Sequence, residues 1–293
     1  MTIIPSDFES CGRKWFGSLA ILVICLMFAT TAVGQDVVQT LTVSRAPVAG
    51  LPPVTQSFIV TAPLSLSPCA VVILLPGGGG NIQLTPLPTI SGPDGTLDIN
   101  SNNFLVRSRW LFGGHGFFTI TLNSATDFQL LPNGLKNEQG SAAHVSDVMQ
   151  VIAWARSTVP GIPVWLVGTS RGTAGAFVAA LYNPASHGPD GLVFTSSVND
   201  SGDPDSLLSA NLSAITVPVL LVGDAGNTCP GTLATDDATV KAKLTSSPKV
   251  TSVILPREGL VPLTDSCDPL SDHGFFGIED LVVRGIADWI KAF

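Results

Sequence analysis

The chain has 293 residues, of which 45% are apolar and only 12% are charged, and its formal net charge is −8. This composition excludes an intrinsically disordered protein, because disordered chains are poor in apolar residues and rich in charge. The negative charge argues against nucleic acid or an anionic membrane surface as a partner. The length is sufficient for one large α/β domain or two small ones.

The first 34 residues have the features of a secretory signal peptide. Two basic residues precede an apolar run at 19–29, and small residues at 32–34 provide a cleavage site. We therefore expect an exported protein, periplasmic or secreted, whose mature form starts at Gln35. The alternative is an uncleaved membrane anchor, but the apolar run is shorter than the ~20 residues that a span needs.

Residues 35–293 contain no linker or internal repeat, and we expect them to form a single domain. Short continuous apolar runs predict strands, and longer segments with apolar residues at helical spacing predict helices. The two kinds of segment alternate along the chain. The predicted strands are 39–44, 56–61, 69–75, 117–122, 163–168, 191–196, 217–222 and 250–255. The predicted helices are 103–111, 140–156, one that begins after Ser170 and ends before Pro184, and 278–290. This order predicts an α/β fold with a mainly parallel sheet, which binds ligands at the carboxyl ends of its strands.

Four glycines, Gly77 to Gly80, follow the buried strand at 69–75. A phosphate-binding loop would have Lys-Ser or Lys-Thr after the glycines, and this chain has neither. A loop that supplies backbone N–H groups to an oxyanion needs only such a glycine-rich turn after an early strand. A merely flexible loop is the third interpretation.

The motif Gly168-Thr169-Ser170-Arg171-Gly172 lies between a buried strand and a helix that is rich in small residues. The Gly-x-Ser-x-Gly pattern alone is common by chance. Its context is typical of a nucleophile elbow, a sharp turn that lifts the serine hydroxyl above the carboxyl edge of a sheet. Ser170 is therefore the candidate nucleophile.

A serine nucleophile needs a base, and the chain has four histidines. His115 and His187 lie in predicted surface turns, and we interpret His144, near the start of a helix, as structural. His273 lies between the last strand and the last helix, which is the place of the base when the residues follow the order serine, acid, histidine. We predict that His273 is the base.

The acid that orients this histidine is expected after the strand at 217–222. Asp224 is the carboxylate in that loop and the first candidate. Asn227 is the second, because it lies nearer the usual position of the acid and an amide can orient a histidine without charge. Three further carboxylates near His273 are expected to be exposed: Asp265, Asp268 and Asp272.

Export would leave three cysteines in an oxidising compartment, so at most one pair can form. Cys229 closely follows the candidate acid, and Cys267 precedes His273 by six residues. We predict a disulfide between these two cysteines, because it would clamp the acid loop to the histidine loop. Cys69 lies in an apolar run and is expected to be a buried thiol.

Over residues 70–293 these motifs resemble the α/β-hydrolase superfamily, in particular its small single-domain bacterial exported members with cysteines near the acid and histidine loops. The segment 267–279 is similar to the histidine loop of that group. The chain departs from the group at Asn227, where an aspartate usually stands. The resemblance implies that the backbone N–H of Arg171 and one from Gly78 or Gly79 bind the oxyanion.

The sequence thus predicts a serine hydrolase that acts on small-molecule carboxylic esters through an acyl-enzyme, with no metal or organic cofactor. Hydrolysis of amides or peptides by the same residues is one alternative. A non-catalytic or weakly active binding protein with the same fold is another, which the asparagine at position 227 motivates.

Overall fold

A computed structural model describes residues 36–293 except for 48–49, 64–66, 85–96, 98, 100, 183–186 and 257–258. The predicted signal peptide lies outside the described residues. Within them, the model contains no helix that combines the length and the apolar character needed to cross a membrane.

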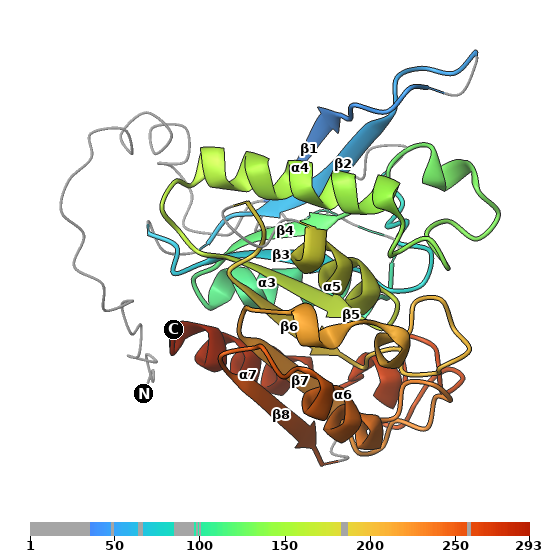
Figure 1. Cartoon of the computed structure of the whole chain (residues 1–293), viewed down its shortest axis with the longest axis vertical. Helices are drawn as coiled ribbons and strands as arrows, with labels where there is room; N and C mark the ends of the chain where they lie inside the picture. Colours follow the sequence, from blue (N-terminus) through green and yellow to red (C-terminus); the bar gives the residue numbers. More distant parts are fainter. Residues whose placement is uncertain are drawn as a thin grey trace, which may run out of the picture.

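The described residues form a sheet of eight strands in the order β1-β2-β4-β3-β5-β6-β7-β8 (Figure 1). The strands are β1 Asp36–Thr42, β2 Thr55–Thr61, β3 Val71–Leu75, β4 Phe118–Leu122, β5 Val164–Thr169, β6 Gly191–Thr195, β7 Val219–Asp224 and β8 Val250–Leu255. Strands β3 to β8 pair in parallel, whereas β1 and β2 are antiparallel to their neighbours. The predicted α/β fold with a mainly parallel sheet is confirmed.

Helices cover both faces of this sheet (Figure 1). The helices are α2 Phe104–Arg107, α3 Arg109–Gly114, α4 Ala142–Thr158, α5 Gly172–Tyr182, α6 Asp237–Lys243 and α7 Glu279–Lys291. Alternate side chains of β3 point to opposite faces: Ile73 joins the core under α4 and α5, and Val72 joins the core under α3 and α7. Both faces of the strand are therefore buried, and each such apolar side chain stabilises the fold by about 1.5–3 kcal/mol.

Two helical segments differ from the sequence prediction. The helix expected at 103–111 is divided at Ser108 into α2 and α3. Helix α6 was not predicted, because Val240 is its only fully buried apolar residue and a single position produces no helical periodicity.

The prediction for Cys69 is wrong in two respects. The residue precedes β3 instead of lying within it, and it is half-buried. Its backbone N–H donates to the carbonyl of Gly116 rather than to the neighbouring strands. The apolar character of residues 69–75 therefore extends two residues beyond the strand itself.

Candidate active site

Ser170 lies on the turn between β5 and α5, at the carboxyl end of the sheet, and has a φ of 52°. A left-handed φ in a residue other than glycine costs about 1–3 kcal/mol and occurs where the surrounding structure enforces it. The two motif glycines do so here. A Cβ on Gly168 would lie 2.5 Å from the Gly172 carbonyl oxygen, and one on Gly172 would overlap the Leu75 carbonyl oxygen. Helix α5 therefore packs closely enough to fix the sharp turn.

The glycine-rich loop after β3 lies directly against this turn. A Cβ on Gly77 would lie 2.9 Å from the Cβ of Ser170, so Gly77 is the glycine whose Cα faces the serine. The loop is fixed by hydrogen bonds from Gly80 N to the Gly77 carbonyl at 3.2 Å and from Leu135 N to the Gly79 carbonyl at 2.9 Å. These contacts argue against the interpretation of a merely flexible loop.

The backbone N–H groups predicted to bind an oxyanion are those of Arg171 and of Gly78 or Gly79. None of the three donates a hydrogen bond to another described residue. Gly78 is exposed and has a φ of 62°, and Gly79 is partly exposed. These three N–H groups are therefore not committed to a partner among the described residues, and Gly77, which precedes two of them, contacts Ser170.

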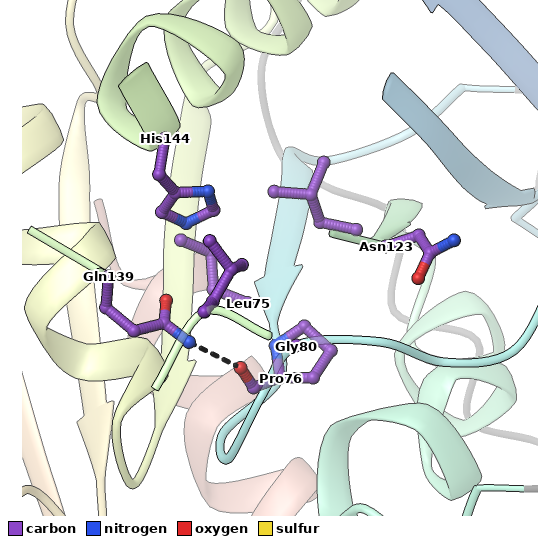
Figure 2. A pocket seen from close by; sticks show the side chains of 8 residues that line it. Leu75, Pro76, Gly80, Asn123, Gln139 and His144 are labelled. Carbon is purple, nitrogen blue, oxygen red and sulfur yellow. Dashed lines mark hydrogen bonds between the residues drawn. The ribbon is translucent and has the colours of Figure 1, made fainter. Parts of the chain in front are cut away.

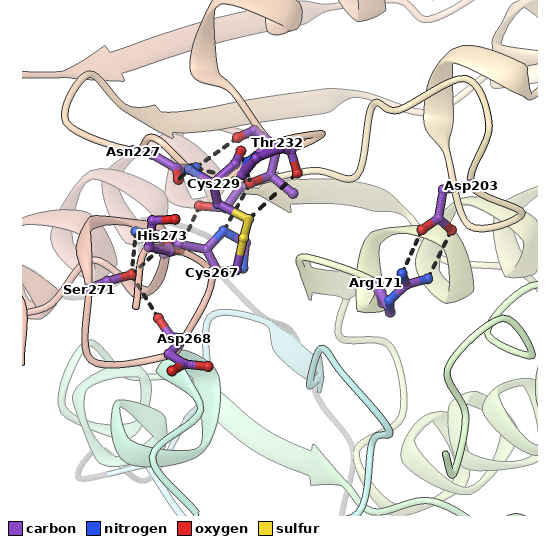
Figure 3. The surroundings of a disulfide bond; sticks show 12 residues. Arg171, Asp203, Asn227, Cys229, Thr232, Cys267, Asp268, Ser271 and His273 are labelled. Atoms are coloured by element: carbon purple, nitrogen blue, oxygen red, sulfur yellow. Dashed lines mark hydrogen bonds and ion pairs between the residues drawn. A yellow bond between two sulfur atoms is a disulfide. The ribbon is translucent and has the colours of Figure 1, made fainter. Parts of the chain in front are cut away.

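The Arg171 side chain fixes a neighbouring loop. Its guanidinium forms an ion pair with Asp203 at 2.5 Å (Figure 3). It also forms an ion pair with Asp205 at 2.8 Å and donates to the Asn137 side chain at 3.1 Å. The residue after Ser170 is thereby anchored through its side chain.

His273 lies in the 3₁₀ turn η6 (Asp272–Gly274) and is 7% exposed. Ser196 Oγ donates to the His273 carbonyl at 2.8 Å, while Ser170 N donates to the carbonyl of the adjacent residue, Thr195, at 2.9 Å. The end of β6 thus connects the serine turn to the histidine turn. The described contacts include no hydrogen bond between Ser170 Oγ and the imidazole; such bonds are often long until substrate binds.

The hydrogen-bond partner of the His273 ring is Thr232, a residue that the sequence did not single out. Thr232 Oγ1 lies 3.1 Å from His273 Nδ1 (Figure 3). Asn227 is one step further away: its Nδ2 donates to the Thr232 carbonyl at 2.7 Å and to Oγ1 at 3.3 Å. A threonine in a loop carries no sequence signal for such a role.

Asp224 is the last residue of β7 and is buried. Its Oδ1 accepts a hydrogen bond from Gly226 N at 2.7 Å. Of the other carboxylates near His273, Asp265 and Asp268 are exposed as expected. The expectation that Asp272 is exposed is wrong: it is 6% exposed, because the whole 3₁₀ turn that it shares with His273 and Gly274 is buried.

Burial lowers the pKa of His273 to about 4, and the Asp268 carboxylate opposes this shift by favouring the charged ring. The imidazole is therefore neutral at pH 7. A neutral imidazole is the form that can accept a proton from a serine hydroxyl.

The predicted disulfide is confirmed. Cys229 and Cys267 are joined, with their Cα atoms 4.7 Å apart, and they are 38 positions apart in the chain (Figure 3). The bond links the loop that carries Asn227 and Thr232 to the loop that carries His273. It therefore restricts the relative motion of the histidine and its partner.

A second buried histidine, His144, lies near the start of α4 and faces a cavity of about 10 Å³ behind the glycine-rich loop (Figure 2). Pro76 and Gln139 also line this cavity, and Gln139 Nε2 donates to the Pro76 carbonyl at 3.5 Å. Neither ring nitrogen of His144 has a hydrogen-bond partner among the described residues. Burial, together with the positive charge of Arg45, lowers its pKa to about 4.

Potential metal ligands are scattered in the part of the chain that the structure describes. Its histidine, cysteine, aspartate and glutamate side chains form no group of three or more that could hold a metal ion.

No protein family model and no curated protein matches this sequence. Solved structures do match. A dienelactone hydrolase from Anabaena variabilis is 16% identical, with a TM-score of 0.58 over 88% of this chain and 99% of that one. XC6422 from Xanthomonas campestris, described as an α/β serine hydrolase without lid, is 15% identical, with a TM-score of 0.53 over 87% and 93%. A cold-adapted esterase from an Arctic intertidal metagenomic library is 14% identical, with a TM-score of 0.53 over 90% and 95%.

Each of these matches covers most of both chains. The protein has the α/β-hydrolase fold, as its sequence motifs predicted.

Proposed function

We propose that the protein is an exported serine hydrolase that cleaves carboxylic esters of small molecules. The observation that carries this proposal is the strained turn at Ser170, which the end of β6 connects to the histidine turn through hydrogen bonds at Thr195 and Ser196. A backbone strain of this kind is maintained by close glycine packing and serves to expose the serine hydroxyl.

In the proposed reaction, Ser170 Oγ attacks the ester carbonyl while His273 Nε2 accepts the hydroxyl proton. The N–H groups of Arg171 and of Gly78 or Gly79 stabilise the negative oxygen of the tetrahedral intermediate. His273 then donates the proton to the departing alkoxide, and the alcohol leaves. Water, activated by the same histidine, hydrolyses the acyl-enzyme and restores the serine.

Two further lines support the finer parts of the proposal. Dienelactone hydrolase and esterase are the descriptions of structural neighbours, and both names denote cleavage of ester bonds. Export is supported by the basic and apolar pattern of residues 1–34 and by the disulfide, since such bonds persist in oxidising compartments.

The test is covalent labelling of residues 35–293 with a fluorophosphonate probe, followed by mass spectrometry of the labelled peptide. We expect the label on Ser170 and its loss in Ser170→Ala. Ser108→Ala is the control, because Ser108 is buried between α2 and α3, whereas Ser170 is partly exposed on its turn. A folded wild-type protein that takes up no label, and that hydrolyses neither 4-nitrophenyl esters nor the corresponding anilides, would overturn the proposal in favour of a binding protein.

A further inference from the structure

Thr232 Oγ1 is surrounded by three polar groups, and all of them are buried. Asn227 Nδ2 lies at 3.3 Å, the Cys229 carbonyl oxygen at 3.2 Å and His273 Nδ1 at 3.1 Å. A hydroxyl has one proton to donate and two lone pairs that accept. Because the hydroxyl can donate only once and accept twice, the three contacts restrict which atom carries the proton in each of them.

Asn227 is oriented without ambiguity. Its Oδ1 accepts from Cys229 N at 3.0 Å, and its Nδ2 donates to the Thr232 carbonyl at 2.7 Å. Reversal of the amide would place two donors together at one end and two acceptors at the other. Nδ2 is therefore a donor toward Thr232 Oγ1, which uses one lone pair of the hydroxyl.

Two arrangements remain for the hydroxyl proton. If Oγ1 donates to His273 Nδ1, its lone pair faces the lone pair of the Cys229 carbonyl at 3.2 Å. If Oγ1 donates to that carbonyl instead, its second lone pair accepts a proton from Nδ1–H. The Cys229 carbonyl also accepts from Thr232 N at 3.2 Å, so it has a donor in either arrangement. Only the second arrangement avoids the approach of two acceptor oxygens and makes each of the three side-chain contacts a hydrogen bond.

From this geometry we propose that Thr232 is the positioning residue of His273: its hydroxyl, held by Asn227 and the Cys229 carbonyl, selects the tautomer with the proton on Nδ1. Nε2 is then the bare nitrogen that can take the Ser170 proton. The ring is oriented by a neutral chain of hydrogen bonds that ends on a backbone carbonyl, and among the described residues it has no hydrogen bond to a carboxylate. This inference rests on the proposed serine hydrolase function.

The same geometry explains why position 227 carries an amide. In Asn227→Asp, one carboxylate oxygen would replace Nδ2 at 2.7 Å from the Thr232 carbonyl, where two acceptors repel each other. We expect this variant to weaken the site. A residue that merely replaced the usual acid would behave in the opposite way, and the aspartate would raise activity.

The kinetic test compares Thr232→Ser and Thr232→Val by the rate of fluorophosphonate labelling and by hydrolysis of 4-nitrophenyl acetate. Thr232→Ser keeps the hydroxyl and is expected to stay within about threefold of wild type. Thr232→Val keeps the shape but loses the hydrogen bond, and its kcat is expected to fall about tenfold or more with KM unchanged. Equal rates in both variants, or a gain in Asn227→Asp, would overturn the proposal.

A measurement that needs no reaction separates this inference from the proposed function. The ¹⁵N chemical shifts of the imidazole at pH 7, assigned with a His273→Gln variant, report which nitrogen carries the proton. A protonated Nδ1 in wild type, with mixed tautomers in Thr232→Val, supports the role of Thr232. A protonated Nε2 in wild type overturns it, whether or not the protein is labelled by the probe.

Discussion

His273 and His144 are both almost fully buried, and burial lowers the pKa of each to about 4. Their surroundings are otherwise opposite. His273 lies in a loop at the carboxyl end of the sheet, bonded to Thr232 and close to a disulfide (Figure 3). His144 is on helix α4, and its ring faces the back of the glycine-rich loop (Figure 2).

The difference shows that a shifted pKa does not by itself identify a catalytic base. Desolvation acts on any buried imidazole, so both rings are neutral at pH 7. A base must also have a group that selects its tautomer and a position next to the nucleophile. The His273 ring contacts Thr232, and the Ser196 contact connects its turn to the end of β6, whereas the His144 ring has no hydrogen-bond partner among the described residues.

The largest expected difference between the two histidines is in catalysis. His273→Ala removes the proposed base and is expected to lower kcat for 4-nitrophenyl acetate by about 10³-fold or more. His144→Met fills a similar volume with an adaptable side chain, and we expect kcat within a few-fold of wild type. If His144→Met loses activity to the same extent while its circular dichroism stays native, the distinction drawn between the two rings is wrong.

Removal of the disulfide is expected to show how much of the His273 environment depends on that bond. For a separation of 38 positions, the double variant Cys229→Ala with Cys267→Ala should lose about 4 kcal/mol of unfolding free energy in urea titrations. Its kcat should fall as well, because the Thr232 loop is no longer tied to the histidine loop. Cys69→Ala is the control for the loss of a cysteine side chain. If its unfolding free energy and kcat fell by similar amounts, the disulfide would have no specific role in the His273 environment.

The pH dependence of stability should reveal the burial of His144. An unfolded histidine has a pKa of about 6.5, so the unfolded chain binds more protons than the folded one between pH 6.5 and pH 4. The contribution of neutral His144 is therefore complete above pH 6.5 and is lost as the pH falls to about 4. The shift corresponds to about 3 kcal/mol.

The comparison of His144→Met with wild type isolates this contribution. Burial raises the pKa of Asp237 to about 7, so its contribution to the unfolding free energy grows as the pH falls, opposite to that of His144. This contribution is the same in both proteins and therefore cancels when their unfolding free energies are subtracted. We expect the variant to lose less unfolding free energy than wild type between pH 6.5 and pH 4, as measured by urea titration at each pH. Parallel curves for the two proteins would show that His144 is not buried in its neutral form.

The smallest expected effect concerns Asp268, whose carboxylate raises the pKa of His273. In Asp268→Asn this pKa should fall slightly, since the aspartate is exposed and its charge is screened. The acid limb of the kcat/KM profile, expected near pH 4, should move to lower pH by that amount. Movement of the acid limb to higher pH in Asp268→Asn would show that Asp268 does not raise the pKa of His273. Movement of the acid limb in His144→Met would show that the limb reports the titration of His144 and not of His273.

Three features could be predicted from the amino-acid sequence alone: the alternation of strands and helices, the turn at Ser170 and the position of His273 between the last strand and the last helix. Each of these depends on local properties. Buried parallel strands produce continuous apolar runs, and the glycines at 168 and 172 are required wherever a helix leaves a strand this closely. The disulfide between Cys229 and Cys267 was also predictable, because only three cysteines follow residue 34 and these two lie in the loops near the candidate acid and His273.

Only the tertiary structure decided which side chain contacts the His273 ring. The sequence offered Asp224 and Asn227, because carboxylates and amides are the groups expected beside a histidine. The fold places Asp224 at the end of β7, bonded to Gly226, and inserts Thr232 between Asn227 and the ring. That arrangement results from the path of one loop, closed by a disulfide and by backbone hydrogen bonds. No local pattern in the sequence encodes the direction in which such a loop turns its hydroxyl.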